Sequence, residues 1–155
     1  MSATISRPGK AGWRHRLFSG QPHQIIGSGE RTYLRRWFLI PANRWCNIYW
    51  HRFEGSDEPV PHDHPWPFAS IVLYGSYIEV SSDGRRKRRV PGRLAVRRAT
   101  YRHYIVLEDD DGTQRPCTTL VITGPHRRDW GFWCAEDRFI PWQEFDASGC
   151  GPVRP

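Results

Sequence analysis

The sequence has 155 residues, a formal net charge of +7 and an aromatic content of 14%, with 14 glycines and 13 prolines. This length predicts one domain that can bury a hydrophobic core, and the aromatic content excludes a chain that is disordered throughout. No apolar stretch is long enough to span a membrane. Glycine and proline between short apolar runs favour many short strands and turns over long helices.

The cysteines and the start of the chain bear on the cellular compartment. Cys46, Cys117, Cys134 and Cys150 are widely spaced and form no CxxC pair, so we expect reduced thiols. The basic amino-terminal segment lacks the apolar stretch of a secretory signal. Together these features predict a cytoplasmic protein.

Three segments are expected along the chain. Residues 1–29 combine Pro, Gly, Ser and Arg with little periodicity, which predicts an arm that is loosely ordered or docked. Aromatic side chains such as Trp13 and Phe18 are the candidates for docking it onto the body. Residues 30–146 contain the apolar runs of a barrel, and residues 147–155 are expected to form a flexible tail.

Short β-prone runs follow one another through the expected barrel and predict an all-β domain. Turn residues indicate two hairpins, one around Gly75 and one around Pro91-Gly92. So many short strands in one domain are typical of an antiparallel barrel or jelly roll. The expected strands are residues 31–40, 44–53, 68–73, 76–80, 87–90, 94–97, 103–107, 117–123 and 129–134.

Two histidines stand directly ahead of one of these runs. Side chains alternate between faces in an extended segment, so His62 and His64 point the same way while Asp63 points opposite. Two imidazoles can bind one divalent metal, but a useful site needs a third ligand, and His103 is the best donor. Two simpler interpretations stay open, because the pair could be surface histidines and His103 a hydrogen-bonded core residue.

These residues resemble the two motifs of the cupin superfamily. His62-Asp63-His64, with Gly75 beyond it, resembles the first motif, and His103 resembles the lone histidine of the second. The late segment GPHRRDWGFW, residues 124–133, resembles small uncharacterised cupins of phage and bacterial origin. The resemblance implies a cupin-like antiparallel β-barrel with a metal site.

The sequence departs from both motifs. Ala69 stands where the first motif has its acidic ligand, and Arg98 and Thr100 stand where the second has Pro and Gly. Three neutral imidazoles leave about two positive charges of a divalent ion uncancelled, which favours an anionic ligand. Glu79 has two candidate roles. It is either a fourth metal ligand that replaces the missing acid, or a residue that forms an ion pair and supports the site.

A three-histidine site of this kind is similar to that of the thiol dioxygenases. The resemblance implies an iron(II) dioxygenase that acts with O2 on a small anionic substrate, such as a thiol or a carboxylate. In that family an arginine grips a carboxylate of the substrate and a tyrosine lies nearby. By residue type and neighbourhood alone, Tyr101 and Arg128 are the candidate catalytic residues, and Tyr77 and Arg44 are further candidates.

Other functions stay open beside the oxygenase. A non-redox isomerase or lyase would use zinc, manganese or nickel as a Lewis acid. A non-catalytic module would bind a ligand or, through the basic residues 85–89, a nucleic acid, although no nucleic-acid-binding motif accompanies the charge. The resemblance to cupins also implies a homodimer formed through the sheets, and no membrane partner is expected.

Overall fold

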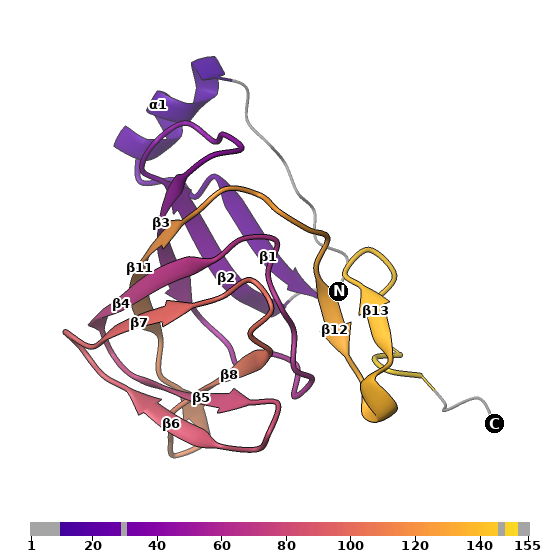
Figure 1. The fold of residues 1–155 in the computed structure, drawn as a ribbon. Helices are drawn as coiled ribbons and strands as arrows, with labels where there is room; N and C mark the ends of the chain where they lie inside the picture. The colour runs from indigo at the N-terminus through magenta and orange to yellow at the C-terminus, as the bar shows by residue number, and fades with distance from the viewer. Residues whose placement is uncertain (1–9, 29–30, 146–147, 152–155) are drawn as a thin grey trace.

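The structure, a computed structural model, describes residues 10–28, 31–145 and 148–151 and consists mainly of antiparallel strands. Within these residues the single α-helix, α1 (Lys10–Phe18), lies at one end of the barrel (Figure 1). None of the described helices has the length and hydrophobicity needed to cross a lipid bilayer. The expectation of an all-β barrel is confirmed.

The larger sheet has six strands, and every neighbouring pair is antiparallel. Its middle is formed by the sequence CTTLVIT, whose β-branched residues suit a strand that is paired on both edges. In order across the sheet, the strands are β1 (Gln24–Ser28), β2 (Arg31–Phe38), β3 (Asn47–Phe53), β11 (Cys117–Thr123), β4 (Phe68–Tyr74) and β7 (Leu94–Arg97).

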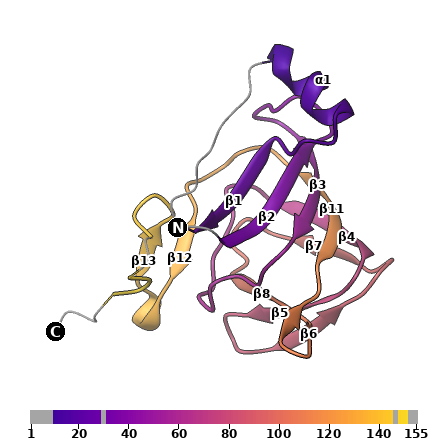
Figure 2. The same ribbon diagram turned by 180° about the vertical axis from the view of Figure 1, so that it is seen from behind.

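The smaller sheet has three strands, in the order β6 (Arg86–Arg89), β5 (Tyr77–Ser81) and β8 (His103–Leu107). Isolated bridges from His62 to β8 and to Phe132 connect this sheet with a late hairpin. That hairpin stands beside the barrel when the molecule is seen from behind (Figure 2). The remaining elements are the late hairpin, β12 (Gly131–Trp133) and β13 (Phe139–Pro141), the 3-10 helix η1 (Ala135–Asp137) between them, and the short pair β9 (Asp109–Asp110) and β10 (Thr113–Gln114).

The hydrophobic core lies between the two sheets. Alternate residues of β3 are buried, so one face of this strand points into the barrel and the other toward solvent. Leu34 of the larger sheet belongs to the same buried cluster as Tyr77 and Leu107 of the smaller one. The two inner faces therefore enclose a common interior, in which the candidate site is found.

The two hairpins that the turn residues indicate are not formed. Instead, β4 pairs with β7 in the larger sheet, while β5 pairs with β6 in the smaller. At both turns the chain crosses from one sheet to the other, which is the connection that a jelly roll uses. The first crossing requires glycine, because Gly75 has a φ of 75° and a Cβ there would lie 2.6 Å from the carbonyl oxygen of Pro116.

The amino-terminal segment has more regular structure than its sequence indicates. Trp13 of α1 docks as expected, since its Nε1 donates a 2.7 Å hydrogen bond to the carbonyl oxygen of Phe38, whereas Phe18 is 84% exposed. β1, which falls inside the expected arm, extends the larger sheet; its five residues include a glycine and are too short to show a clear alternation. Residues 1–9 of the arm and most of the expected tail, residues 147 and 152–155, lie outside the described residues.

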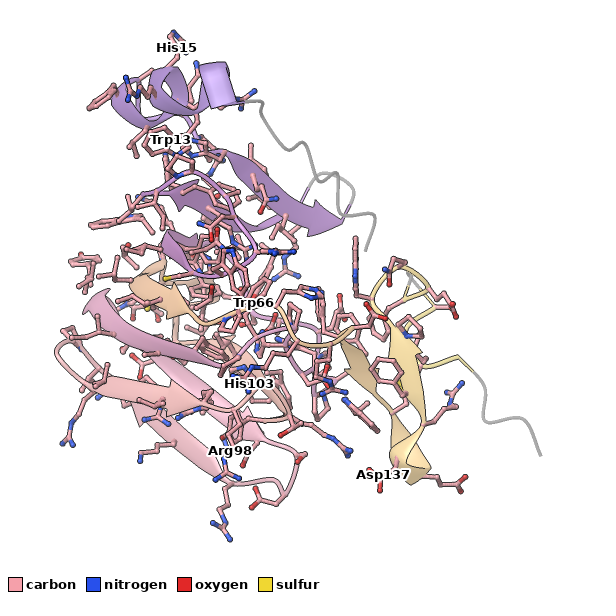
Figure 3. The ribbon with its side chains drawn as sticks, turned by 45° about the horizontal axis from the view of Figure 1, so that its top comes forward. Trp13, His15, Trp66, Arg98, His103 and Asp137 are labelled. Carbon is pink, nitrogen blue, oxygen red and sulfur yellow. A yellow bond between two sulfur atoms is a disulfide. The ribbon has the colours of Figure 1, made fainter. Side chains whose placement is uncertain are left out.

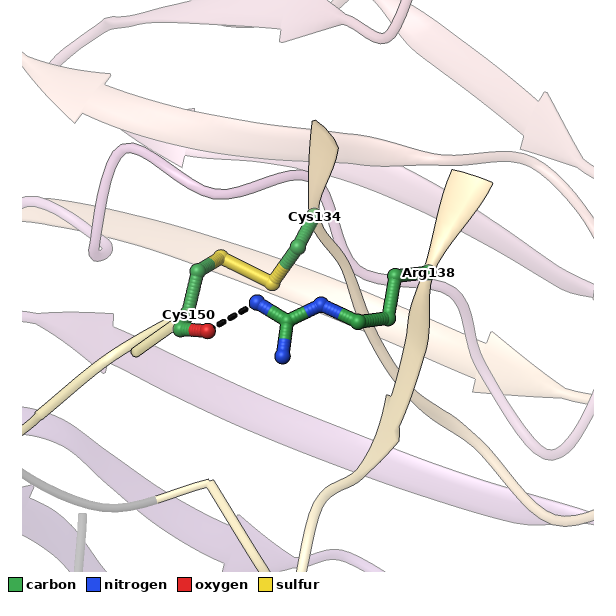
Figure 4. The surroundings of a disulfide bond; sticks show 3 residues. All are labelled: Cys134, Arg138 and Cys150. Atoms are coloured by element: carbon green, nitrogen blue, oxygen red, sulfur yellow. Dashed lines mark hydrogen bonds between the residues drawn. A yellow bond between two sulfur atoms is a disulfide. The ribbon is translucent and has the colours of Figure 1, made fainter. Parts of the chain in front are cut away.

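Cys134 and Cys150 form a disulfide bond (Figure 4). The expectation of reduced thiols is therefore wrong for this pair, because a separation of 16 residues does not reveal that the two chain segments meet. Arg138 strengthens the junction by donating a hydrogen bond to the carbonyl oxygen of Cys150. Cys46 and Cys117 are free thiols. Because disulfides persist mainly in oxidising compartments, the cysteines no longer support a cytoplasmic location.

Candidate metal centre

The three candidate ligands come together because the segment before β4 bridges to β8. The backbone N–H of His62 donates to the carbonyl oxygen of His103 at 2.9 Å, and the N–H of His103 donates back to His62 at 3.0 Å. This bridge places His64 beside His103 although the two are 39 residues apart. Figure 3 shows His103 in the interior of the barrel, together with Trp66 from the same bridging segment.

The ring nitrogens of the three histidines converge. One nitrogen of each ring lies within 4.8 Å of the others, and the Nε2 atoms of His64 and His103 are 2.9 Å apart. Two nitrogens bound at about 2.1 Å to one ion, at a right angle, would be ~3 Å apart. The spacing therefore fits two ligands of a shared ion.

The protonation states also fit a metal. Burial lowers the pKa of His62 and holds the pKa of His64 well below its ordinary value, with further lowering by the neighbouring imidazoles. Neutral imidazole is the form that binds metal ions. Among the described residues, Nδ1 of His62 is buried without a hydrogen-bond partner, so the ring is not fully satisfied by the protein alone.

Glu79 of β5 supports His103. Its carboxylate accepts a 2.9 Å hydrogen bond from Nδ1 of His103 and forms buried ion pairs with Arg89 and Arg97. With the proton on Nδ1, the Nε2 lone pair of His103 faces the other histidines. Burial raises the pKa of Glu79, but the hydrogen bonds from His103, Arg97 and Arg89 outweigh it and hold that pKa well below its usual range. These contacts match the role of a residue that forms ion pairs and supports the candidate ligand His103, not the role of a fourth metal ligand.

Asp63 lies between the two adjacent histidines in sequence, and its side chain is fully buried. It accepts hydrogen bonds from Arg128 Nη1 at 2.6 Å, the backbone N–H of Gly131 at 3.0 Å and Trp133 Nε1 at 2.9 Å. These bonds attach the paired histidines to β12. The candidate Arg128 is thus directed at Asp63, which points away from the histidine rings.

The other sequence candidates fall into two groups. The ring centroid of Tyr101 lies 5.3 Å from that of His103, and the guanidinium of Arg97 stands 4.7 Å above the Tyr101 ring. Tyr101 therefore packs against the candidate ligand His103, but it does not line the central cavity. Tyr77 and Arg44 do line it, and burial raises the pKa of Tyr77 well above its ordinary value.

A cavity of about 1010 Å³ adjoins the three histidines and is large enough for a small molecule. Its walls are mainly aromatic and aliphatic. Trp66, from the segment that carries the histidines, lines it together with Phe68. Phe132 and Trp130 also line it, with ring centroids 5.7 Å and 6.2 Å from that of His62.

Sequence reasoning missed a second polar cluster in the same cavity. Arg36 of β2 and His51 of β3 are paired on neighbouring strands, and both line the cavity. Nε of Arg36 donates a 2.8 Å hydrogen bond to Nε2 of His51. Burial, and then the charge of Arg36, hold the pKa of His51 well below its ordinary value. One signal was available, because His51 alternates with the aromatic residues Tyr49 and Phe53 on the inward face of β3.

The basic segment 85–89 is not a continuous charged surface. Arg89 is 7% exposed and reaches inward to Glu79, while Arg88 pairs with Glu108. Arg85 pairs with Asp83. Much of the charge that suggested a polyanion partner is therefore neutralised by neighbouring carboxylates.

No protein-family model matches the sequence, and no curated protein matches it. Solved structures do match the fold. The polyketide cyclase RemF from Streptomyces resistomycificus superposes with a TM-score of 0.54 at 22% identity, over 72% of this chain and 77% of the cyclase. An uncharacterised conserved protein with a double-stranded β-helix domain from Klebsiella pneumoniae gives a TM-score of 0.51 at 13% identity, over 70% and 89% of the two chains.

A third match is the DMSP lyase DddQ from Ruegeria pomeroyi, with a TM-score of 0.51 at 16% identity. The superposition covers 64% of this chain and 50% of the lyase, so this chain spans about half the length of that relative. At these identities the matches establish the fold alone. The chain has the double-stranded β-helix fold of the cupins, with a cluster of three histidines in its interior.

Proposed function

We propose that this chain is a metal-dependent cupin enzyme in which His62, His64 and His103 hold one divalent ion. The observation that carries the proposal is the convergence of three ring nitrogens at the wall of the cavity, all within 4.8 Å of one another. A bound ion would supply a Lewis acid or, in the case of iron(II), a redox centre for chemistry with O2. Glu79 would keep the lone pair of His103 directed at the ion.

The substrate is a small anionic molecule in this proposal. Three neutral ligands would leave the charge of a divalent ion uncompensated, and Glu79, the buried carboxylate that contacts His103, is already neutralised by Arg89 and Arg97. The aromatic walls of the cavity would exclude water from the substrate's apolar part. A carboxylate or a thiolate would supply the missing negative charge.

Two reaction classes remain candidates. The resemblance of the three-histidine site to thiol dioxygenases favours iron(II) and oxygenation. The names of two proteins with the same fold, a lyase and a cyclase, favour a non-redox reaction. Such a reaction would use zinc, manganese or nickel as a Lewis acid. The two classes differ in oxygen consumption, which makes them separable by one assay.

Tyr101 and Arg128 have supporting roles in this proposal. Tyr101 would restrict the ring of His103 by packing against it under the guanidinium of Arg97. Arg128 would fix the direction of the two adjacent histidines by binding Asp63. Neither role requires contact with the substrate.

The first test is the metal content of protein purified without oxygen, measured by plasma mass spectrometry. We expect about one ion per chain in the wild type and its loss in both His62→Ala and His103→Ala. His126→Ala is the matched control, since His126 lines the cavity but lies outside the cluster. A metal content that is unchanged in all three variants, or absent from the wild type under every metal supplied, would overturn the proposal. Iron followed by oxygen uptake would select the oxygenase.

A further inference from the structure

The position of the proton on His51 follows from its contact with Arg36. Nε of Arg36 donates a 2.8 Å hydrogen bond to Nε2 of His51, and a guanidinium has donors only, so Nε2 is the nitrogen that accepts. Burial, and then the charge of Arg36, hold the pKa of His51 well below its ordinary value, so the ring is neutral at neutral pH. A neutral imidazole keeps one proton, which therefore lies on Nδ1.

The Nδ1–H of His51 has no partner within the described part of the chain. The contacts of the ring are the bond from Arg36, a parallel stack with Tyr49 and an edge contact with Phe53, and none of them uses Nδ1. His51 is only 6% exposed, and it lines the central cavity. Among the same residues, the one polar side-chain atom that is sealed in the protein without a partner is Nδ1 of His62, so Nδ1 of His51 opens to the cavity.

Two hydroxyl side chains adjoin His51 on the inner face of the larger sheet. Thr119 of β11 stands opposite His51 in the register, and Ser70 lies on β4, the next strand across the sheet. Both are buried, and both line the cavity. A hydroxyl can donate and accept, whereas the N–H of His51 can only donate. Three neighbouring strands thus present uncharged hydrogen-bonding groups in a wall that is otherwise mainly apolar.

We propose that His51 is a hydrogen-bond donor for an uncharged oxygen, a carbonyl or a hydroxyl, of the molecule that occupies the cavity. A buried N–H without an acceptor costs free energy, and a ligand oxygen removes that cost. The hydroxyls of Thr119 and Ser70 complete the same subsite, and Arg36 acts through His51 by fixing its tautomer.

This assignment deepens the proposed function, on which it rests for the anionic end of the substrate at the three histidines. The substrate is then a hydroxy acid or an oxo acid, with its charge at the metal and its neutral oxygen at His51. A site built to donate to such an oxygen discriminates against analogues that lack it. The neutral subsite itself needs no metal, so the two proposals can fail separately.

The first test is the tautomer of His51, read from long-range proton–nitrogen correlation spectra of the full chain labelled with ¹⁵N-histidine. The protein is measured after treatment with a chelator and again after loading with zinc. We expect the proton on Nδ1 in both states, and His51→Phe identifies the signal by its loss. A proton on Nε2 would overturn the assignment, because Nδ1 would then have nothing to donate.

The second test is a calorimetric titration of the same two states with phenol and with toluene, which has a methyl group in place of the hydroxyl. We expect phenol to bind His51→Phe about fivefold more weakly than wild type, and Thr119→Val more weakly than wild type, since each variant removes one hydrogen-bonding group. Toluene should bind wild type and both variants with the same affinity. Phenol should also shift the Nδ1 resonance of His51 in the wild type.

Thr118→Val is the matched control, because Thr118 is the adjacent residue of β11 and does not line the cavity. It should bind phenol as the wild type does. Equal phenol affinity in wild type and His51→Phe, a parallel loss of toluene affinity, or no phenol binding to wild type would each overturn the assignment. If His51→Phe does not fold, an unmoved Nδ1 resonance in phenol-treated wild type overturns it instead. Phenol binding without any metal binding would remove only the proposed metal enzyme.

Discussion

Replacing Glu79 by glutamine tests whether the site depends on one buried carboxylate. The change keeps the shape of the side chain but removes its charge, and Glu79 is only 3% exposed. Arg89 and Arg97, whose side chains are 9% and 11% exposed, would then face each other without a counter-ion. Breaking a buried ion pair by removing one partner costs about 3–5 kcal/mol, so we expect a loss of that size in the free energy of unfolding.

The same substitution should weaken metal binding. Glutamine cannot supply the full negative charge that accepts the Nδ1 proton of His103, and loss of such a supporting group typically lowers metal affinity by about 10–100-fold. Urea unfolding of chelator-treated protein gives the stability, and competition with a chromogenic chelator gives the zinc affinity.

Glu108→Gln is the control for Glu79→Gln. Glu108 also pairs with an arginine, Arg88, but its side chain is 27% exposed, so solvent screens the pair and the expected loss is below about 1 kcal/mol. It should leave zinc affinity unchanged. Similar stability losses in the two variants, or a Glu79→Gln protein with wild-type zinc affinity, would refute the reasoning.

Three further predictions follow from the same contacts. In the folded protein the pKa values of His51 and His64 lie well below 6.5, so as the pH falls the unfolded chain binds protons at these histidines before the folded protein does. The urea midpoint of metal-free protein should therefore be constant above about pH 6.5 and decrease below it. A urea midpoint that does not change with pH would contradict this. Asp63→Asn should cost ~2–3 kcal/mol in urea unfolding and lower zinc affinity, since one amide oxygen cannot serve the three donors that Asp63 binds, and wild-type values for both would count against this. Arg89→Gln should destabilise the protein whereas Lys87→Gln should not; equal thermal midpoints would show that Arg89 is not buried with Glu79 in solution.

The parts of the fold that follow from local patterns could be predicted. The spacing of the paired histidines at i and i+2 predicts that His62 and His64 point the same way, and their ring centroids lie 5.2 Å apart. The prediction of the two hairpins was wrong because a glycine turn such as Gly75 reverses the chain without specifying which sheet the next strand joins. That choice depends on the packing of distant strands.

The polar interior of the site could not be predicted for a related reason. Arg36 stands next to Arg35 in a strand rich in basic residues, and such a strand looks like a solvated surface. Only the register with Gln24 and His51 shows that one of the two arginines points inward. Glu79 likewise gains its role from Arg89 and Arg97, which come from two different strands.

The disulfide bond ties the end of the described chain to the wall of the cavity. Phe145 is 2% exposed and stacks on Phe132, with ring centroids 3.7 Å apart, and Phe132 forms a bridge with His62. The bond between Cys134 and Cys150 closes the loop that contains Phe145.

Opening that bond should loosen the wall next to His62. For a loop of about 15 residues the bond contributes ~3 kcal/mol, so Cys150→Ser should lower the free energy of unfolding by that amount. Because Phe145 would then leave Phe132 more often, zinc should also dissociate faster, as followed by transfer to a chromogenic chelator. Cys46→Ser is the control, since Cys46 is a free thiol outside this loop, and it should change neither quantity. If Cys150→Ser matched the control in zinc dissociation while losing stability, the bond would restrain the chain end without supporting the site.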